Sequence, residues 1–212
     1  MPVAETYGLT EGGPVMLGPP LDGRAVPRGS CGAPWPEGEV RLVDGDGRPG
    51  TRLGELEVRN PGVTPGYYKL PEVTKARIRD GWLATGDLFR IDDQGFYYFC
   101  GRTDDAFKCG GETVYPKEVE NRLLSFPGVA DAAVAPIPHP LKGAVPAAMV
   151  VAARGATLEA DALKRHCLAH GPAYAHPRRV VVVAALPLTG VGKVDTGAVR
   201  ARLAALADEG TA

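Results

Sequence analysis

The chain has 212 residues, of which 44% are hydrophobic and 23% charged, the balance of an ordinary globular protein of one large or two small domains. The formal net charge of −1 argues against nucleic acid or an anionic membrane surface as a partner. No apolar run approaches the roughly 20 residues of a membrane span, and the N-terminus lacks the basic and apolar regions of a signal peptide, so we expect a cytoplasmic protein.

The first half of the chain has the pattern of an all-β unit. Gly and Pro are concentrated over 12–66, with short strand candidates between turns. Alternating residues predict strands over 38–44 and 54–60, and a third strand over 95–101 follows a turn. We expect these strands to form a small barrel or a distorted sheet.

The second half alternates between helices and strands. Pro116 is placed at a helix start, where its missing N–H costs nothing. Val119, Leu123 and Phe126 form one apolar stripe, and Gly128 ends the predicted helix.

Three strands and a further helix are predicted beyond this point. The strands cover 129–137, 147–154 and 178–187, the last of them an uninterrupted buried strand. The helix between the second and third strands is expected to begin at Thr157, as a cap, and to close at Gly171.

A last helix over 195–210 completes the pattern. Its apolar face carries three residues, Val199, Leu203 and Leu206. The change from β-rich to α+β pattern falls near residues 102–105, so we expect a β-rich domain over 1–103 and an α+β domain over 104–212.

The cysteines and histidines give no sign of a metal site. Among the histidines only His166 and His170 stand at i and i+4, without a nearby carboxylate or thiol, so we interpret them as a helix surface. The cysteines show no paired spacing and are expected to be free thiols: Cys31, Cys100, Cys109 and Cys167.

Four segments carry residues suited to chemistry, and the first is TYGLTEGG at 6–13. Thr10 and Glu11 offer a hydroxyl and a carboxylate, which suit Mg²⁺ and phosphate. Tyr7 offers a flat face for a base, and Gly8 lets a ligand approach the backbone. A surface turn is the structural alternative.

The second segment, DGWLATGDLFRID at 80–92, places Asp87 between a glycine and an apolar residue. A carboxylate held there can accept hydrogen bonds from both hydroxyls of a ribose. The structural alternative is an aspartate in a turn ahead of a strand.

The third segment spans 101–120, where the pattern changes. Arg102 can bind sugar or phosphate oxygens, Asp104 stands at the expected domain boundary, and Gly110-Gly111 permits an unusual loop. The segment is either a solvated turn between strands or a joint between domains, and the change of pattern favours the joint.

The fourth segment, PLTGVGKVDTGAV at 187–199, places Lys193 in a glycine-containing loop before a helix. A lysine there can reach an anionic ligand and stabilise developing negative charge. A solvated loop is the structural alternative.

Together, in this order and at these distances, the four segments resemble the adenylate-forming (AMP-binding) superfamily. Its members include acyl- and aryl-CoA synthetases, adenylation domains of peptide synthetases and beetle luciferases. The resemblance covers nearly the whole chain and rests on YGLTE (7–11), 54–74, 80–120 and PLTGVGKVD (187–195). It implies a β-barrel-like remnant of a large N-terminal domain, followed by a compact α+β lid domain.

The resemblance also implies an activity and a nucleotide site. The family activates a carboxylic acid with ATP as an acyl-adenylate and passes the acyl group to a thiol, usually that of CoA. In this sequence Tyr7 would stack on adenine, Thr10 would contact phosphate and Glu11 would hold Mg²⁺. Asp87 would bind the ribose hydroxyls and Arg102 the ribose or phosphate. The implied role is in fatty or aromatic acid metabolism.

The remaining family positions fall in the second half of the chain. Lys193 would bridge the substrate carboxylate and the α-phosphate during adenylation. Asp104 occupies the hinge about which the lid swings after adenylation. The loop around Lys108, Gly111 and Glu112 would then line the approach of the CoA pantetheine thiol.

Two features depart from the family pattern. The phosphate loop and the two large upstream subdomains of the family have no counterpart, so we expect a C-terminal fragment that is inactive alone and associates with its N-terminal part or with a second copy. The basic residue that often follows the lysine is also missing, since Lys193 is followed by VDTGAV.

Two alternatives to a CoA ligase stay open. An adenylation enzyme that loads the pantetheine of a carrier protein would use the same residues. A non-catalytic complementing or binding module would instead use an exposed apolar face to associate with a partner. The residues that choose the carboxylic acid are expected mostly upstream of Met1.

Overall fold

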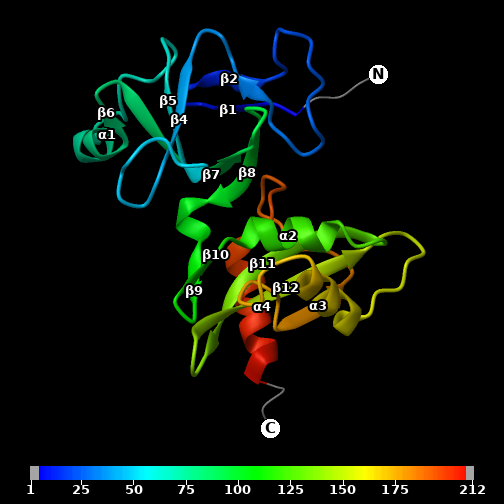
Figure 1. The fold of residues 1–212 in the computed structure, drawn as a ribbon. Coiled ribbons are helices and arrows are strands. Elements are labelled where there is room, and N and C mark those ends of the chain that lie inside the picture. Colours follow the sequence, from blue (N-terminus) through cyan, green and yellow to red (C-terminus); the bar gives the residue numbers. More distant parts are fainter. Residues whose placement is uncertain (1–4, 209–212) are drawn as a thin grey trace. The chain divides into compact units, whose positions relative to one another are not determined.

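The computed structural model describes residues 5–208 and separates the chain into two compact units (Figure 1). The first unit runs to Asp104 and the second begins at Asp105. Each unit has its own hydrophobic core. The α+β class expected from the sequence is confirmed.

Two antiparallel sheets make up the first unit. The smaller sheet consists of β1 (Tyr7–Leu9), β2 (Gly13–Gly18) and β3 (Ala33–Pro34). The larger sheet and its one short helix consist of β4 (Glu39–Val43), β5 (Leu53–Arg59), α1 (Pro71–Arg77), β6 (Ile78–Arg79), β7 (Trp82–Ile91) and β8 (Tyr97–Arg102).

Within residues 5–208 neither of these sheets closes into a barrel. Among the named strands β4 pairs only with β5, whereas closure would need a second neighbour at that edge. The barrel-like form expected from the sequence is therefore replaced by the distorted, open sheets that were its alternative.

Local sequence explains the strands and turns of the larger sheet. Alternate residues of β5 point inward, and Leu56 and Val58 are fully buried. The β4–β5 turn is closed by Asp44, whose Oδ1 accepts hydrogen bonds from two backbone N–H groups at 2.9 Å. Asp92 makes the same kind of turn between β7 and β8, through the N–H groups of Gln94 and Phe96.

The second unit contains one five-stranded sheet and three helices. After a 3₁₀ turn at Thr103–Asp105, its elements are β9 (Phe107–Cys109), β10 (Glu112–Val114), α2 (Pro116–Leu124), β11 (Val129–His139), β12 (Gly143–Ala152), α3 (Ala160–Ala169), β13 (Arg179–Val183) and α4 (Thr196–Asp208). All neighbouring strands are antiparallel except β12 and β13.

The Gly110-Gly111 pair forms the turn of a hairpin between β9 and β10. Cys109 and Glu112 face each other across the hairpin, so the turn has only two central residues. The φ angles of Gly110 and Gly111 are +60° and +92°, a left-handed conformation that favours glycine at both positions. The unusual loop expected here is thus a tight hairpin turn.

Helix α2 follows its predicted start and core face. Pro116 occupies the first turn, and Val119 and Leu123 are fully buried. Phe126 lies beyond the last helical residue but still packs against the core. The side chain of Glu120 fixes the helix to the sheet, because its Oε1 accepts a hydrogen bond from the N–H of Val134 in β11 at 3.0 Å.

Two local predictions in this unit are wrong. Helix α3 begins after Glu159 without a side-chain cap, and Thr157 precedes it because the chain first buries Leu158 in the core. Strand β13 is shorter than predicted and only partly buried: it lies at a sheet edge with β12 as its neighbour, and Val182 is exposed.

Separate cores predict separate responses to core mutations. Leu203→Ala in α4 should destabilise the second unit by about 3 kcal/mol, the usual cost of such a cavity, and Leu56→Ala in β5 should do the same to the first unit. Amide hydrogen exchange followed by mass spectrometry should show faster exchange only in peptides of the mutated unit. Equal loss of protection in both units would contradict independent cores.

Candidate functional site

A buried carboxylate joins three strands of the first unit. Asp87 lies within β7 and is 8% exposed. Its Oδ2 accepts a hydrogen bond from the Tyr7 hydroxyl on β1 at 2.5 Å, and its Oδ1 accepts one from Arg102 Nη1 on β8 at 2.8 Å. The structure thus brings three of the predicted site residues together, and Asp87 is not in a turn ahead of a strand.

The backbone around Asp87 is held in place by a neighbouring threonine. The hydroxyl of buried Thr85 donates to the carbonyl of Leu56 at 2.7 Å and accepts a hydrogen bond from the N–H of Asp87 at 3.1 Å. The register of β7 shifts against both β5 and β8 near this point. Such irregularities re-aim side chains, here toward Tyr7 and Arg102.

Gly86 lets two arginine side chains lie close to the backbone of β7 next to Asp87. Its φ is +74°, and a Cβ atom at this position would lie 2.9 Å from both Arg102 Nη2 and Arg77 Nη1. Its N–H donates to Glu55 Oε1 at 2.8 Å. Arg77 and Glu55 were missed in the sequence, where the only local signal is a glycine next to the aspartate.

Burial and hydrogen bonding keep Tyr7 protonated. Burial raises the pKa of Tyr7 far above its ordinary value, and the hydrogen bond to Asp87 and the charge of that carboxylate raise it further. The ring also packs edge to face on Phe89, with centroids 4.8 Å apart. Tyr7 is therefore a fixed neutral donor to Asp87 at physiological pH.

Thr10 and Glu11 lie in the turn between β1 and β2. Glu11 Oε1 accepts a hydrogen bond from the Tyr67 hydroxyl at 3.3 Å, and Glu11 has no ion pair within the described part of the chain. The Thr10 side chain is exposed. One free carboxylate beside a hydroxyl fits Mg²⁺, which usually takes one or two protein carboxylates together with substrate phosphates.

Gly8 has a structural reason to be glycine. A Cβ atom there would lie 2.1 Å from the carbonyl oxygen of Pro14, so β1 and β2 could not approach each other as they do.

The lysine loop is a closed turn in the second unit. The N–H of Thr189 donates to the carbonyl of Lys193 at 2.7 Å, and the N–H of Lys193 donates to Thr189 Oγ1 at 3.2 Å. The Lys193 side chain is exposed and has no ion pair among residues 5–208. Asp195 starts α4, since its Oδ1 accepts a hydrogen bond from the N–H of Ala198 at 2.9 Å.

The hairpin rim expected to contact a thiol is exposed. Lys108 donates from Nζ to Thr113 Oγ1 at 2.6 Å, and Glu112 is exposed next to the turn residue Gly111. At the unit boundary the side chain of Asp104 is 75% exposed, with Arg77 Nη2 4.0 Å from its Oδ2. The chain at this boundary is solvated.

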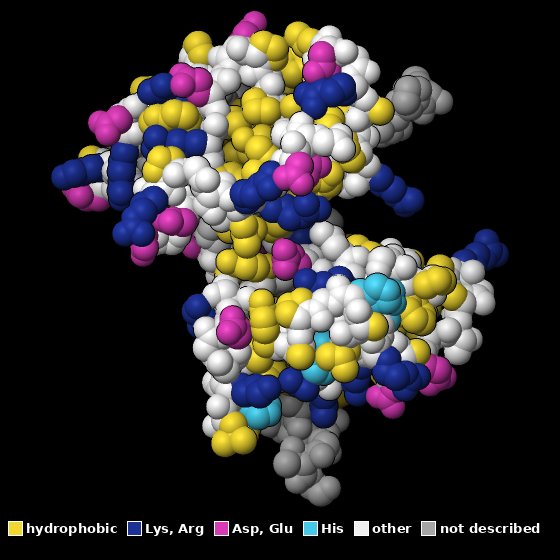
Figure 2. All heavy atoms as spheres, in the orientation of Figure 1, with side chains coloured by type: hydrophobic (Ala, Val, Ile, Leu, Met, Phe, Trp, Pro, Cys, Tyr) yellow, Lys and Arg dark blue, Asp and Glu magenta, His cyan; other side chains and the backbone are white. Residues whose placement is uncertain are grey.

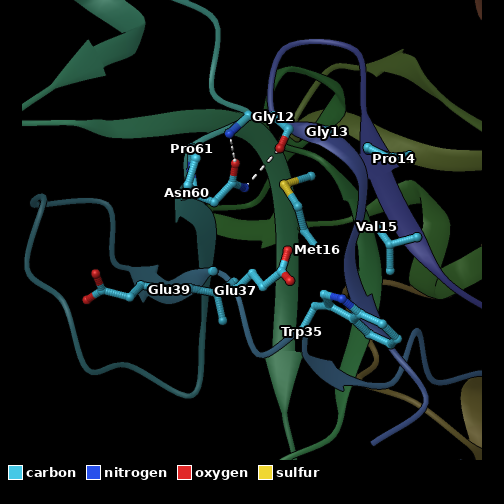
Figure 3. Close-up of a pocket in the computed structure, with 13 residues that line it drawn as sticks. Gly12, Gly13, Pro14, Val15, Met16, Trp35, Glu37, Glu39, Asn60 and Pro61 are labelled. Atoms are coloured by element: carbon cyan, nitrogen blue, oxygen red, sulfur yellow. Dashed lines mark hydrogen bonds between the residues drawn. The ribbon is translucent and has the colours of Figure 1, made fainter.

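A mostly apolar cavity of about 370 Å³ lies beside the 10–12 turn (Figure 3). Asn60 joins two of its walls: its Nδ2 donates to the carbonyl of Gly12 at 2.9 Å, and its Oδ1 accepts from the N–H of Gly62 at 2.7 Å. Met16 and Trp35 supply apolar lining. No feature of the sequence had indicated this cavity.

The described residues give no sign of a metal cluster or of a membrane-spanning helix. Basic and acidic side chains are interspersed on the face drawn in Figure 2. Within residues 5–208 no group of three or more His, Cys, Asp or Glu could hold a metal ion, and all four cysteines are buried. None of the helices in that range is long and apolar enough to cross a membrane.

Comparison with known proteins gives two family matches. The family described as AMP-binding enzyme matches residues 1–68, and the family described as AMP-binding enzyme C-terminal domain matches residues 118–193. The chain is 38% identical over 200 residues to a feruloyl-CoA synthase of Amycolatopsis sp., and 37% identical over 196 residues to a 2-succinylbenzoate–CoA ligase of Geobacillus kaustophilus. Each match covers 92% of this chain and 40% of the relative.

Solved structures give the same picture. ATP-bound MatB from Rhodopseudomonas palustris superposes with a TM-score of 0.82 at 35% identity, covering 92% of this chain and 39% of that one. The O-succinylbenzoate coenzyme A synthetase MenE from Bacillus subtilis, in complex with AMP, gives a TM-score of 0.79 at 31% identity, covering 91% of this chain and 40% of that one. The chain therefore spans about 40% of the length of the relatives it matches.

The shared carboxylate makes a prediction about stability and titration. Asp87→Ala removes the partner of both Tyr7 and Arg102 and should destabilise the first unit by about 2 kcal/mol. The pKa of Tyr7 should fall but stay above its ordinary value, because burial is the larger cause. A tyrosine with a raised pKa keeps its proton to a higher pH in the folded chain than in the unfolded chain. Stability should therefore decline above about pH 10, and the decline should end at a lower pH in the variant.

Urea unfolding and titration of tyrosine absorbance measure the two effects. Asp46→Ala is the matched control, because it breaks an exposed ion pair with Arg48 and should change stability by less than about 0.5 kcal/mol. Equal effects of the two substitutions would contradict a special role for Asp87.

Proposed function

Because this chain belongs to the adenylate-forming (AMP-binding) superfamily, we propose that it forms the nucleotide-binding edge and the lid of an AMP-forming acid–thiol ligase. In the first step a carboxylate oxygen of the acid attacks the α-phosphorus of ATP, and pyrophosphate leaves. In the second step the thiol of CoA loses its proton and attacks the acyl carbon, and AMP leaves. The products are a thioester, AMP and pyrophosphate.

The observation that carries this proposal is the Asp87 carboxylate held between Tyr7 and Arg102. Each oxygen of Asp87 accepts one hydrogen bond and, because a carboxylate has about four acceptor positions, each can accept another from a ribose hydroxyl. The Arg102 side chain is 44% exposed and keeps further donors for ribose or phosphate oxygens. Tyr7 would offer its ring to adenine.

The turn after β1 would hold the phosphates. Thr10 would donate to a phosphate oxygen, and Gly8 would let the nucleotide lie close to the backbone. Glu11 would hold Mg²⁺, which neutralises phosphate charge when bound. This assignment is supported by the free state of the Glu11 carboxylate, which is not used in an ion pair among the described residues.

The second unit would act as the lid in both steps. Lys193 would neutralise charge between the acid and the α-phosphate during adenylation, because it stands free on a closed turn. The rim of Lys108, Gly111 and Glu112 would line the path of the pantetheine thiol. Asp104, exposed between two independent cores, would be the pivot between a first domain over 1–103 and a mobile domain over 104–212.

CoA is the proposed acceptor because the curated relatives are named as CoA ligases. The use of ATP and CoA would place the enzyme in the cytoplasm. Relatives named for ferulate, 2-succinylbenzoate and long-chain fatty acids define the first acids to be tested.

The complete gene product should release pyrophosphate only when a suitable acid is present. Addition of CoA should then yield an acyl-CoA thioester, followed by mass spectrometry. Transfer to a purified carrier protein but not to CoA would favour the carrier-loading alternative. Pyrophosphate release that does not depend on any acid would contradict the proposal.

Lys193→Ala should separate the two steps. Adenylation should slow by about 10²-fold or more, the cost of losing one preorganised charge, while thioester formation from a preformed acyl-adenylate should stay close to that of the parent. Lys164→Ala is the matched control, because Lys164 is paired on the surface with Asp161. Equal losses in both steps would argue against a role confined to adenylation.

A further inference from the structure

Two segments far apart in the sequence are joined at the proposed phosphate turn. Residues 60–67, which connect β5 to α1, make three hydrogen bonds to residues 11–12. The Asn60 amide donates to the carbonyl of Gly12 at 2.9 Å, the N–H of Thr64 donates to the carbonyl of Glu11 at 2.7 Å, and the Tyr67 hydroxyl donates to Glu11 Oε1 at 3.3 Å. The first two hydrogen bonds are accepted by backbone carbonyls of the 11–12 turn, and only the third is accepted by a side chain of the turn, that of Glu11.

The 60–67 segment is itself fixed. Asn60 is oriented by both groups of its amide: Nδ2 donates to the carbonyl of Gly12, and Oδ1 accepts a hydrogen bond from the N–H of Gly62. The N–H of Tyr67 donates to Thr74 Oγ1 in α1 at 2.9 Å, and Thr74 Oγ1 donates to the carbonyl of Leu70 at 3.0 Å. Tyr67 therefore approaches Glu11 from a braced position.

The charges around Glu11 leave its carboxylate available. Two arginines lie in this region, but neither forms an ion pair with Glu11: Arg77 pairs with Glu55 and Asp104, and Arg102 pairs with Asp87. A neutral phenol can orient a carboxylate without the positive charge that would compete with a cation. Glu11 Oε2 accepts no hydrogen bond from the described residues.

We propose that Tyr67 is a positioning residue for Glu11, holding Oε1 so that Oε2 faces a divalent cation. This inference rests on the proposed function, which assigns the cation to Glu11. Partners that hydrogen-bond a metal-binding carboxylate fix its orientation, and their loss weakens metal binding without removing the ligand.

Tyr67→Phe tests the inference, because it removes only the hydroxyl and keeps the ring. With the complete protein and ATP, the dissociation constant for Mn²⁺, measured by electron paramagnetic resonance of the free ion, should rise about tenfold. The Mg²⁺ concentration that half-saturates pyrophosphate release should rise by the same factor, while the rate at saturating Mg²⁺ stays within about twofold of the parent. A merely structural role would not confine the change to metal dependence.

Tyr68→Phe is the matched control, because the adjacent ring is 85% exposed and makes no hydrogen bond to Glu11. Thermal unfolding of both variants checks that the fold is retained. Mn²⁺ affinities equal within twofold for Tyr67→Phe, Tyr68→Phe and the parent would overturn the role of Tyr67, whatever the activity. Failure of the proposed function has a different signature, since it appears as acid-independent pyrophosphate release in the parent.

Discussion

A buried negative charge is the constraint around which the first unit is arranged. A carboxylate taken out of water is costly unless it is paired and hydrogen-bonded, and Asp87 receives one partner from β1 and one from β8. These partners are 80 and 15 residues away in the sequence, so satisfying the charge brings the smaller and the larger sheet together. The same constraint gives the proposed nucleotide site its shape, because the side chains that stabilise Asp87 are those that would surround a ribose.

Each of the two units has a packed hydrophobic core, whereas the segment that connects them is exposed to solvent. The two cores are separate, and the 3₁₀ turn at Thr103–Asp105 between them contains no buried residue. Few buried contacts need to break for such a segment to change its backbone angles. Such solvation is what the proposed pivot at Asp104 requires.

Features set by nearest neighbours could be predicted from the sequence. The helix after Pro116, with Val119 and Leu123 inward, and the alternation of β5 follow local rules, and the structure confirms both. The cap expected at Thr157 and the buried character expected of β13 are wrong, because burial of Leu158 and the edge position of β13 depend on the assembled sheet. Local pattern does not contain that information.

The candidate site likewise contains residues that the sequence predicted and residues that only the folded chain reveals. Tyr7, Asp87 and Arg102 each had a structural alternative when taken singly, and the family resemblance assigned them to one nucleotide site. Their hydrogen bonds to one another were not predicted. Arg77, Glu55, Asn60 and Tyr67 carried no local signal, because they act through register shifts and long-range hydrogen bonds. Their roles depend on geometry that only the folded chain supplies.

The two loops proposed to alternate at the reacting atoms are each closed by their own backbone. The Gly110-Gly111 turn joins two paired strands, and the Thr189–Lys193 turn is closed by a hydrogen bond between its own backbone groups. A lid that presents two such preformed turns in alternation would not have to order a flexible segment in each catalytic cycle. The loss of conformational entropy in both proposed surfaces would then occur once, when the chain folds, and each proposed catalytic cycle would need only a change of orientation.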